Sequence, residues 1–337
     1  MARYHVYGVG NALVDLEYEV PETLLETLSV DKGRMTLIEE PRHHELLERL
    51  EDVECRPCGG GSAANTMVAA AQLGSAAFYS CRVADDETGR FYVADLTANG
   101  LATNLDRDAL ESGITGKCII LITPDAERSM STFLGVTREL SVAALDEAAI
   151  RDSERLYIEG YLVPETNARA AAVRAREIAD AARVATSLTL SDVNMVRFFR
   201  EGLLEIIGEG LDLVFANEEE AREMFGAATL EDAIEGMKGI ARRFAVTRSG
   251  DGAVLFDGRE TIEVSAERVE AVDATGAGDV YAGAFMHALT HGSDFRAAGE
   301  LAGAAATALV TRVGARLGGD EIREIARRHG VAAPAGH

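Results

Sequence analysis

The sequence predicts an α/β protein in which a mainly parallel sheet lies between two layers of helices. Strand and helix patterns alternate along most of the chain, as in parallel strands joined by right-handed crossovers. The 337 residues, 47% of them apolar, can bury a substantial core. Aromatic residues are only 6% of the chain and Trp is absent, so Ala-rich helices and strands rich in Val, Leu and Ile are expected to supply the packing.

The expected elements follow one another in a regular order. A first strand covers 4–9, and a glycine-rich turn at 59–61 leads into a helix of small residues that stops at Gly74. The alternation continues with strands at 155–159, 185–192, 211–216 and 245–247, a hairpin over 253–264, and helices over 166–182, 193–207, 230–244, 277–291, 295–313 and 320–329. Ligands of such a sheet bind beyond the carboxyl ends of its strands, where Asn217, Thr247 and Asp279 are expected.

The most informative motif is Asp-Ala-Thr-Gly-Ala-Gly-Asp, which runs from Asp273 to Asp279 directly before an apolar helix pattern. The small residues Gly276, Ala277 and Gly278 let backbone N–H groups converge at a helix N-terminus, where the helix dipole attracts anions. The carboxylate of Asp279 is then placed to accept a proton from a hydroxyl that attacks a phosphate. The alternative is an ordinary helix start, where the dipole alone stabilises an Asp.

A second glycine-rich turn contains Gly59 and Gly60 and is followed by Ser62 and Asn65 at the start of a helix. Glycine admits close contact with a ligand, and Ser62 can cap the helix. The amide of Asn65 offers both a donor and an acceptor to a polyhydroxy substrate. Taken alone, the pattern is also that of a simple turn between a strand and a helix.

The two motifs together, G-G-x-x-x-x-N and D-x-T-G-A-G-D, resemble the two signatures of the ribokinase-like carbohydrate kinase family, also called PfkB. The resemblance spans nearly the whole chain. It implies a ribokinase-like three-layer α/β/α core with a small β-sheet lid, ATP and Mg²⁺ as cofactors, and phosphoryl transfer to an alcohol group. Asn11 and Asp15, in G-N-A-L-V-D after the first strand, resemble the family's ligands for sugar hydroxyls.

Two further elements agree with the family in the expected order. Asn217 and Glu220 form the N-x-x-E element that in relatives orders water around Mg²⁺ and the phosphates. Thr247, Gly250 and Gly252 in T-R-S-G-D-G match the family's nucleotide loop. Each element also has a structural interpretation, because N-x-x-E is a common helix cap and T-R-S-G-D-G can form an ordinary hairpin turn.

A monovalent-cation site is also implied by the resemblance. Asp273 and Thr275, with the loop 313–315, resemble the residues that bind such a cation, for example K⁺, in some members of the family.

The resemblance further implies that the stretches interrupting the alternation pair into a lid. A lid would exclude water, which otherwise takes the phosphoryl group in place of the substrate. Met130, Phe133 and Leu134 could supply apolar contact to a sugar or base, or could simply belong to the core. The expected organisation is a core formed by 1–12, 40–115 and 136–330, a lid formed by 13–39 and 116–135, and a tail over 331–337.

The composition argues against several classes of function. With 33 basic and 56 acidic residues, the formal net charge is −23 and the pI is near 4.7. This charge argues against a surface that binds nucleic acid or an anionic membrane. Four cysteines do not make a secreted disulfide framework in a chain this long, and neither a hydrophobic signal region nor a bilayer-spanning apolar run is present. We therefore expect a cytoplasmic protein.

The acidic composition leads to a testable prediction. One explanation is adaptation to a salty cytoplasm, in which ions screen the repulsion between carboxylates. We then expect the melting temperature to rise as KCl is added, which scanning calorimetry over a salt series would measure. A melting temperature that does not rise with salt would remove this explanation.

The resulting hypothesis is an ATP-dependent kinase. A primary hydroxyl of a substrate held by Asn11, Asp15, Gly60 and Asn65 would pass its proton to Asp279 as it attacks the γ-phosphate. The segments G-N-A-L-V-D, K-G-R-M and S-M-S-T-F-L-G look more like adenosine kinases than ribokinases, so an adenosine-like nucleoside is the leading substrate. The alternative is a free sugar of the ribose, fructose or 2-keto-3-deoxygluconate type. A catalytically silent sensor of nucleotide or sugar is a hypothesis of a different class. Relatives are monomers or lid-paired homodimers, and either state is expected here.

Overall fold

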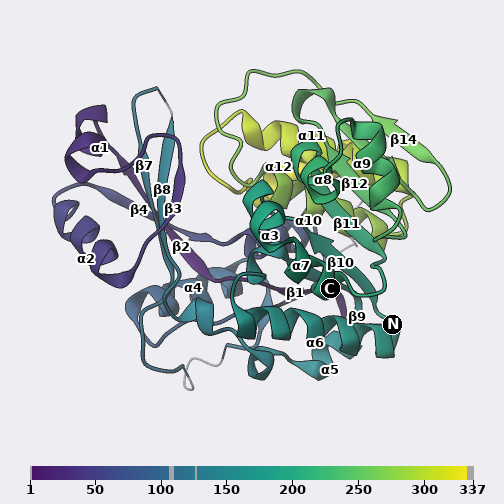
Figure 1. Ribbon diagram of the computed structural model, residues 1–337, viewed down its shortest axis with the longest axis horizontal. Helices are drawn as coiled ribbons and strands as arrows, with labels where there is room; N and C mark the ends of the chain where they lie inside the picture. Colours follow the sequence, from purple (N-terminus) through teal and green to yellow (C-terminus); the bar gives the residue numbers. More distant parts are fainter. Residues whose placement is uncertain (1, 106–109, 126, 332–337) are drawn as a thin grey trace.

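The computed structural model describes residues 2–105, 110–125 and 127–331. These residues form a large α/β core and a smaller lid beside it (Figure 1). The expected tail over 331–337 lies outside the described residues except for Val331.

The core is built on a nine-stranded sheet with the strand order β14-β13-β12-β11-β10-β9-β1-β5-β6. All neighbouring strands from β12 to β6 are parallel, and β12, β13 and β14 form an antiparallel meander at one edge. The strands are β1 (Tyr4–Val9), β5 (Ala77–Ser80), β6 (Ala102–Thr103), β9 (Ser153–Glu159), β10 (Ala185–Thr189), β11 (Leu213–Asn217), β12 (Phe244–Thr247), β13 (Ala253–Phe256) and β14 (Thr261–Val264).

Helices cover both faces of this sheet. Successive strand residues point to opposite sides, and the apolar side chains on each side pack against a layer of helices. Val6 of β1 packs into one hydrophobic cluster, whereas Tyr7 packs into the other. The first face carries α3 (Ser62–Gln72), α4 (Glu87–Ala98), α10 (Ala277–Thr290), α11 (Phe295–Val310) and α12 (Gly319–Arg328). The second carries α5 (Glu147–Arg151), α6 (Thr166–Ala182), α7 (Val193–Ile207), α8 (Glu218–Phe225) and α9 (Leu230–Met237). Short 3₁₀ helices lie at Gly135–Glu139, Val142–Ala144, Gly160–Leu162 and Ser249–Asp251. The three-layer α/β/α architecture expected from the sequence is confirmed.

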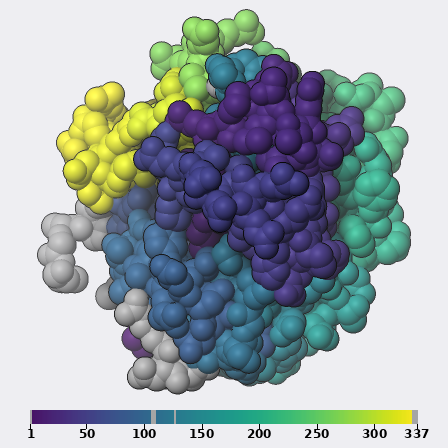
Figure 2. All heavy atoms as spheres, turned by 90° about the vertical axis from the view of Figure 1, so that its left-hand side faces the viewer, coloured from purple at the N-terminus to yellow at the C-terminus, as the bar shows by residue number. Residues whose placement is uncertain are grey.

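The lid is a separate five-stranded sheet with the order β3-β8-β7-β2-β4. Its strands are β2 (Leu13–Glu19), β3 (Met35–Leu37), β4 (Cys55–Gly60), β7 (Lys117–Ile122) and β8 (Arg128–Phe133). Helices α1 (Glu22–Leu28) and α2 (Glu40–Arg49) cover its outer face, where Tyr18, Leu46 and Ile119 share one hydrophobic cluster. In Figure 2 the purple N-terminal residues of this lid face the viewer, with blue residues below them and teal residues at the right.

The lid is larger than the sequence indicated. The segment 40–115, expected in the core, begins with α2 and β4, and both belong to the lid. The reason is that β4 pairs antiparallel with β2 and that Leu46 of α2 is buried against the lid sheet.

Several element boundaries also differ from the expected ones. The helix expected over 230–244 ends at Met237, because the glycines at 236 and 239 favour a turn, and Phe244 begins β12. The strand expected over 185–192 ends at Thr189. In the part of the chain that the structure describes, no helix combines the length and the apolar character needed to cross a membrane.

Candidate active site

Helix α10 begins at the glycine turn that the sequence singled out. Gly276 is its N-cap with φ of +74°, and a Cβ there would lie 2.5 Å from the Ala315 carbonyl oxygen, so only glycine fits. The Ala277 N–H donates to the Ala274 carbonyl at 3.2 Å, whereas the amides of Gly276 and Gly278 have no acceptor among the described residues. These two amides, at the positive end of the helix, can bind an anion.

The carboxylate of Asp279, in the first turn of α10, faces the start of α3. Its Oδ1 accepts a hydrogen bond from Ser62 Oγ at 2.6 Å, and its Oδ2 accepts one from Asn65 Nδ2 at 3.2 Å. Ser62 therefore does not cap α3 as expected; Gly61 is the N-cap and the hydroxyl binds the carboxylate instead. The two glycine-rich turns, remote in sequence, meet at this one side chain.

Burial raises the pKa of Asp279 to about 6, although the hydrogen bonds from Ser62 and Asn65 and the charge of Arg316 oppose this rise. A general base must be ionised, so protonation of Asp279 removes its function. We therefore expect kcat/KM to be constant above about pH 7 and to fall about tenfold per pH unit below about pH 6. Initial rates between pH 5 and pH 8 would measure this limb. A rate constant that stays level down to pH 5 would contradict the role of this carboxylate.

Asn11 and Asp15 both lie against the glycine turn that leads into α3; a Cβ at Gly61 would be 2.4 Å from the Asn11 carbonyl oxygen. A Cβ at Gly60 would lie 2.5 Å from the carboxylate of Asp15, so this glycine lets the carboxylate lie against the backbone of the turn. Burial is the main cause that raises the pKa of Asp15 to about 7; the charges of Arg316 and Arg128 oppose this rise, and those of Glu17 and Asp279 add to it. Asn11 Nδ2 donates to Glu159 Oε1 at 2.9 Å and to the Tyr161 carbonyl at 3.3 Å.

Glu159, at the carboxyl end of β9, is a site residue that the sequence analysis missed. It is 1% exposed, and its Oε2 accepts a hydrogen bond from the Ala63 N–H at 2.8 Å while its Oε1 binds Asn11. Burial raises its pKa to about 7. One buried carboxylate thus joins the segment after β1 to the N-terminus of α3. Its place at the end of a predicted parallel strand was the signal that could have identified it.

Arg316, in the loop between α11 and α12, is a second residue that was missed. Its Nε donates to Asn65 Oδ1 at 2.8 Å and its Nη1 to Asp95 Oδ2 at 2.7 Å. Gly59, an expected substrate residue, lies against this ion pair, because a Cβ there would be 2.1 Å from Asp95 Oδ2. A single arginine in a glycine-containing loop gave no sequence signal.

Asp273 and Thr275, expected at a monovalent-cation site, lie between the glycine turn and the lid. Asp273 Oδ1 accepts the Thr275 N–H at 2.9 Å, and its Oδ2 accepts the Gly314 N–H at 2.8 Å and also binds Arg128 of the lid. Burial opposes ionisation of Asp273, but these partners outweigh it and lower the pKa. Arg128 also binds Glu17, so a guanidinium of the chain itself neutralises the carboxylate assigned to K⁺ and joins the lid to the glycine turn.

The placement of Phe133 requires a correction. Phe133 lies opposite Lys117 in the lid sheet, whereas the preceding Thr132 aligns with Cys118 and Asp15. Because side chains alternate across a strand, Phe133 points to the face away from Asp15. There its ring stacks on His43 of α2 at a centroid distance of 4.7 Å, as part of the packing of the lid.

Asn217 and Thr247 end the neighbouring strands β11 and β12 and are partners in the sheet register. Asn217 and Glu220 form a capping box on α8: Asn217 Oδ1 accepts the Glu220 N–H at 2.8 Å, and Glu220 Oε2 accepts the Asn217 N–H at 3.0 Å. Gly252 has φ of +85° and completes the turn into β13, whereas Gly250 has open space around it. The N-x-x-E element therefore forms a helix cap, and the T-R-S-G-D-G segment forms a turn. Both lie at the edge of the sheet where a ligand would bind.

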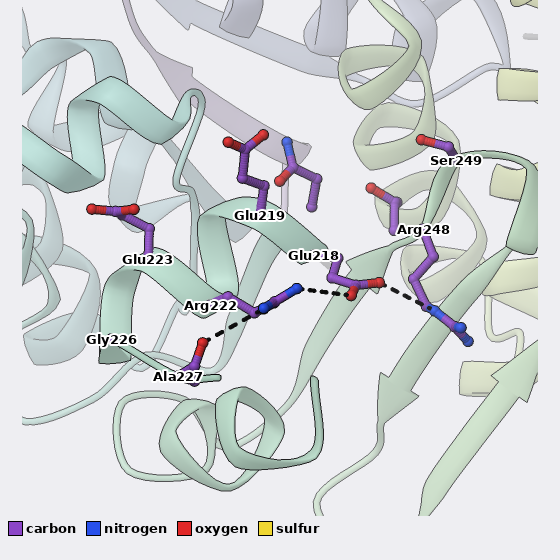
Figure 3. A pocket seen from close by; sticks show the side chains of 10 residues that line it. Glu218, Glu219, Arg222, Glu223, Gly226, Ala227, Arg248 and Ser249 are labelled. Carbon is purple, nitrogen blue, oxygen red and sulfur yellow. Dashed lines mark hydrogen bonds and ion pairs between the residues drawn. The ribbon is translucent and has the colours of Figure 1, made fainter. Parts of the chain in front are cut away.

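A pocket of about 610 Å³ lies at this edge, lined by Asn217, Thr247 and Ser249 and by acidic residues of α8 (Figure 3). Glu218 binds Arg222 and Arg248 at 3.8 and 3.5 Å, so two cations line the pocket as well. Glu223, Gly226 and Ala227, at the end of α8, also line the pocket.

The residues near Asn217 fit a magnesium ion held through water. Burial is the main cause that raises the pKa of Glu220 to about 7, and the negative charges of Asp192 and Glu219 act in the same direction, against the hydrogen bond from the Asn217 N–H. These neighbouring carboxylates favour a cation nearby. Within the described residues, no three His, Cys, Asp or Glu side chains converge to hold a metal directly. Mg²⁺ commonly binds through phosphates and water with few carboxylates, which is compatible with this arrangement.

Comparison with known proteins identifies the family. A family model described as "pfkB family carbohydrate kinase" matches residues 29–322. The chain belongs to this family. This PfkB protein is therefore a sugar or nucleoside kinase, a phosphotransferase that acts on a hydroxyl group.

Individual relatives of this PfkB kinase differ in substrate. The crystal structure of adenosine kinase from Sinorhizobium meliloti superposes with a TM-score of 0.88 at 34% identity, covering 97% of this chain and 99% of that one. An adenosine kinase from Schizophyllum commune is 28% identical over 87% of this chain and 91% of its own length. An ATP-dependent ribose-1-phosphate kinase from Halopiger xanaduensis is 31% identical over 77% of this chain and 83% of its own length.

Proposed function

We propose that this kinase transfers the γ-phosphate of ATP to a primary hydroxyl of an adenosine-like nucleoside, with Asp279 as the general base. The proposal rests on the hydrogen bonds that Ser62 and Asn65 donate to the Asp279 carboxylate, at the point where the N-termini of α3 and α10 meet. An acceptor hydroxyl beside this carboxylate would lose its proton to it as the oxygen attacks phosphorus.

In the proposed mechanism, Asn11, Asp15 and the turn at Gly60 bind the other hydroxyls of the acceptor and orient it. The free amides of Gly276 and Gly278 stabilise the charge that develops on the transferred group. Mg²⁺ would neutralise the β and γ oxygens of ATP, with Asn217 and Glu220 orienting its water. The lid excludes water from the reacting groups.

The lid face that carries Asp15 supports a nucleoside acceptor. Asp15, Cys118, Thr132 and Leu37 occupy one row across the lid sheet, and Met35 lies on the same face. Met35 and Leu37 are 41% and 55% exposed, which gives this face an apolar surface suited to a base. The names of the two adenosine kinase relatives agree with this choice, whereas the ribose-1-phosphate kinase supports a sugar-type acceptor as the second candidate.

A coupled assay of ATP consumption would test the proposal. The panel should contain adenosine and other nucleosides, ribose, fructose, 2-keto-3-deoxygluconate and ribose 1-phosphate. We expect the highest kcat/KM with an adenosine-like nucleoside. Turnover of sugars alone would replace the nucleoside with the second candidate, and turnover of no acceptor would favour a silent sensor.

We further propose that the partners are limited to these small molecules. The net charge of −23 supports a protein that avoids nucleic acid and anionic membranes, and a cytoplasmic location agrees with the use of ATP. The chain is proposed to act as a monomer or as a dimer paired through its lid, and sedimentation equilibrium would distinguish the two states.

A further inference from the structure

We propose that Arg316 is a positioning residue, which fixes the Asn65 amide against Asp279 and supplies a positive charge that faces the carboxylates of the acceptor site. The inference rests on the proposed function only in the role given to Asp279. Arg316 would act through these neighbours, without contact with the reacting atoms.

The hydrogen bonds of Asn65 allow one orientation of its amide. Its Oδ1 accepts from Arg316 Nε at 2.8 Å, and its Nδ2 donates to Asp279 Oδ2 at 3.2 Å. A flipped amide would set its NH₂ group against the guanidinium and its oxygen against the carboxylate. A donor would then face a donor, and an acceptor would face an acceptor. Arg316 therefore determines that the donor end of Asn65 points at the general base.

Arg316 is itself held in place. Its Nη1 donates to Asp95 Oδ2 at 2.7 Å, and the two side chains are only 17% and 21% exposed. The two residues before it contact the other glycine turn, because the Gly314 N–H donates to Asp273 Oδ2 at 2.8 Å and Ala315 lies against Gly276. One short loop thus contacts the start of α10 and, through Arg316, the start of α3.

The charge of Arg316 acts on both acceptor carboxylates. Burial raises the pKa values of Asp15 and Asp279, and the charge of Arg316 lowers both; Arg128 of the lid also lowers that of Asp15. The titratable groups whose charges couple to Asp279 are Arg316, Asp15, Glu159, Tyr157 and Tyr161. Arg316 is the one cation in this group, so its removal leaves carboxylates and phenols around the base.

Two variants separate the charge of Arg316 from its geometry. Arg316→Gln removes the charge, and Arg316→Lys keeps a charge but loses the Nε donor to Asn65. Arg312→Gln is the matched control, because Arg312 lies in the same loop region and pairs with Glu321 on the surface. Titration of ¹³C-labelled aspartate carboxyls by NMR would follow Asp279, with its signal assigned by its loss in Asp279→Asn. Rates with the best acceptor of the wild-type enzyme would be measured alongside.

In Arg316→Gln we expect the titration midpoint of Asp279, and the acid limb of kcat/KM, to rise by about one pH unit. In Arg316→Lys we expect the midpoint to stay near the wild-type value while kcat falls about tenfold. Arg312→Gln should change neither. An unchanged midpoint in Arg316→Gln, or an unchanged kcat in Arg316→Lys, would overturn the inference. If the wild-type protein consumes no ATP, the proposed function fails, whereas the NMR titration still decides the role of Arg316.

Discussion

Replacing Asp279 with asparagine is expected to lower kcat by about 100-fold or more while leaving the affinity for ATP nearly unchanged. The amide keeps the size of the carboxylate and can still accept the hydrogen bond from Ser62. It cannot take a proton from an attacking hydroxyl, and its NH₂ group would meet the NH₂ group of Asn65. Initial-rate kinetics with the best acceptor, together with ATP titration by calorimetry, would measure the two effects.

Asp294→Asn is the matched control for this experiment. Asp294 is an exposed Asp at the N-terminus of the next helix, α11, where it accepts the Ala297 N–H at 2.8 Å. Both variants remove one negative charge near the N-terminus of a helix, but Asp294 is an N-cap, whereas Asp279 lies in the first turn. If Asp279 only stabilises a helix start, both should leave kcat unchanged, and full activity of Asp279→Asn would end its assignment as the base.

Replacing Glu159 with alanine is expected to cost about 2 to 4 kcal/mol of unfolding free energy and to raise KM for the acceptor by about tenfold or more. The change removes the buried acceptor of the Ala63 N–H and of the Asn11 amide, so both donors lose their partner. The turn that leads into α3 and the segment after β1 then lose their common anchor. KM for ATP should change little, because Asn217 and Thr247 lie on other strands.

Urea denaturation and separate KM measurements for acceptor and ATP would check this result. Glu154→Ala is the control, because Glu154 lies on the same strand β9 with an exposed side chain. It should leave both KM values unchanged. Equal increases of the two KM values in Glu159→Ala would point to general loosening of the fold and would contradict a specific role at the acceptor side.

The parts of the fold that depend on local patterns could be predicted. The expected bounds agree with the structure for the strand over 4–9 and the helices over 166–182 and 193–207. The apolar periodicity of each element reflects which of its residues pack into the core. The glycines around Asp279 were recognised because a positive φ and a close backbone approach leave few alternatives to glycine. The order of motifs then indicated the family, which the family comparison confirmed.

The remaining features depend on contacts between distant segments. Strand β4 carries Pro57 and two glycines, a weak strand pattern, and joins the lid only because β2 lies beside it. The outward position of Phe133 depends on the register of its strand. An error of one residue in the predicted strand boundary would place its side chain on the opposite face. Glu159 and Arg316 carry no motif, and their roles arise from neighbours far along the chain, Ala63 and Asn65.

The path of the chain between the core and the lid has a mechanical consequence. Strand β2 enters the lid two residues after Asn11, and β4 returns from it at Gly60, two residues before α3 begins. The chain also enters the lid before β7 and leaves it after β8, but the two connections next to Asn11 and Gly60 are the peptides that would grip the acceptor. Any tilt of the lid changes that grip and the shielding of the phosphoryl group together. A redesign of acceptor preference through lid residues will consequently trade affinity against protection from hydrolysis.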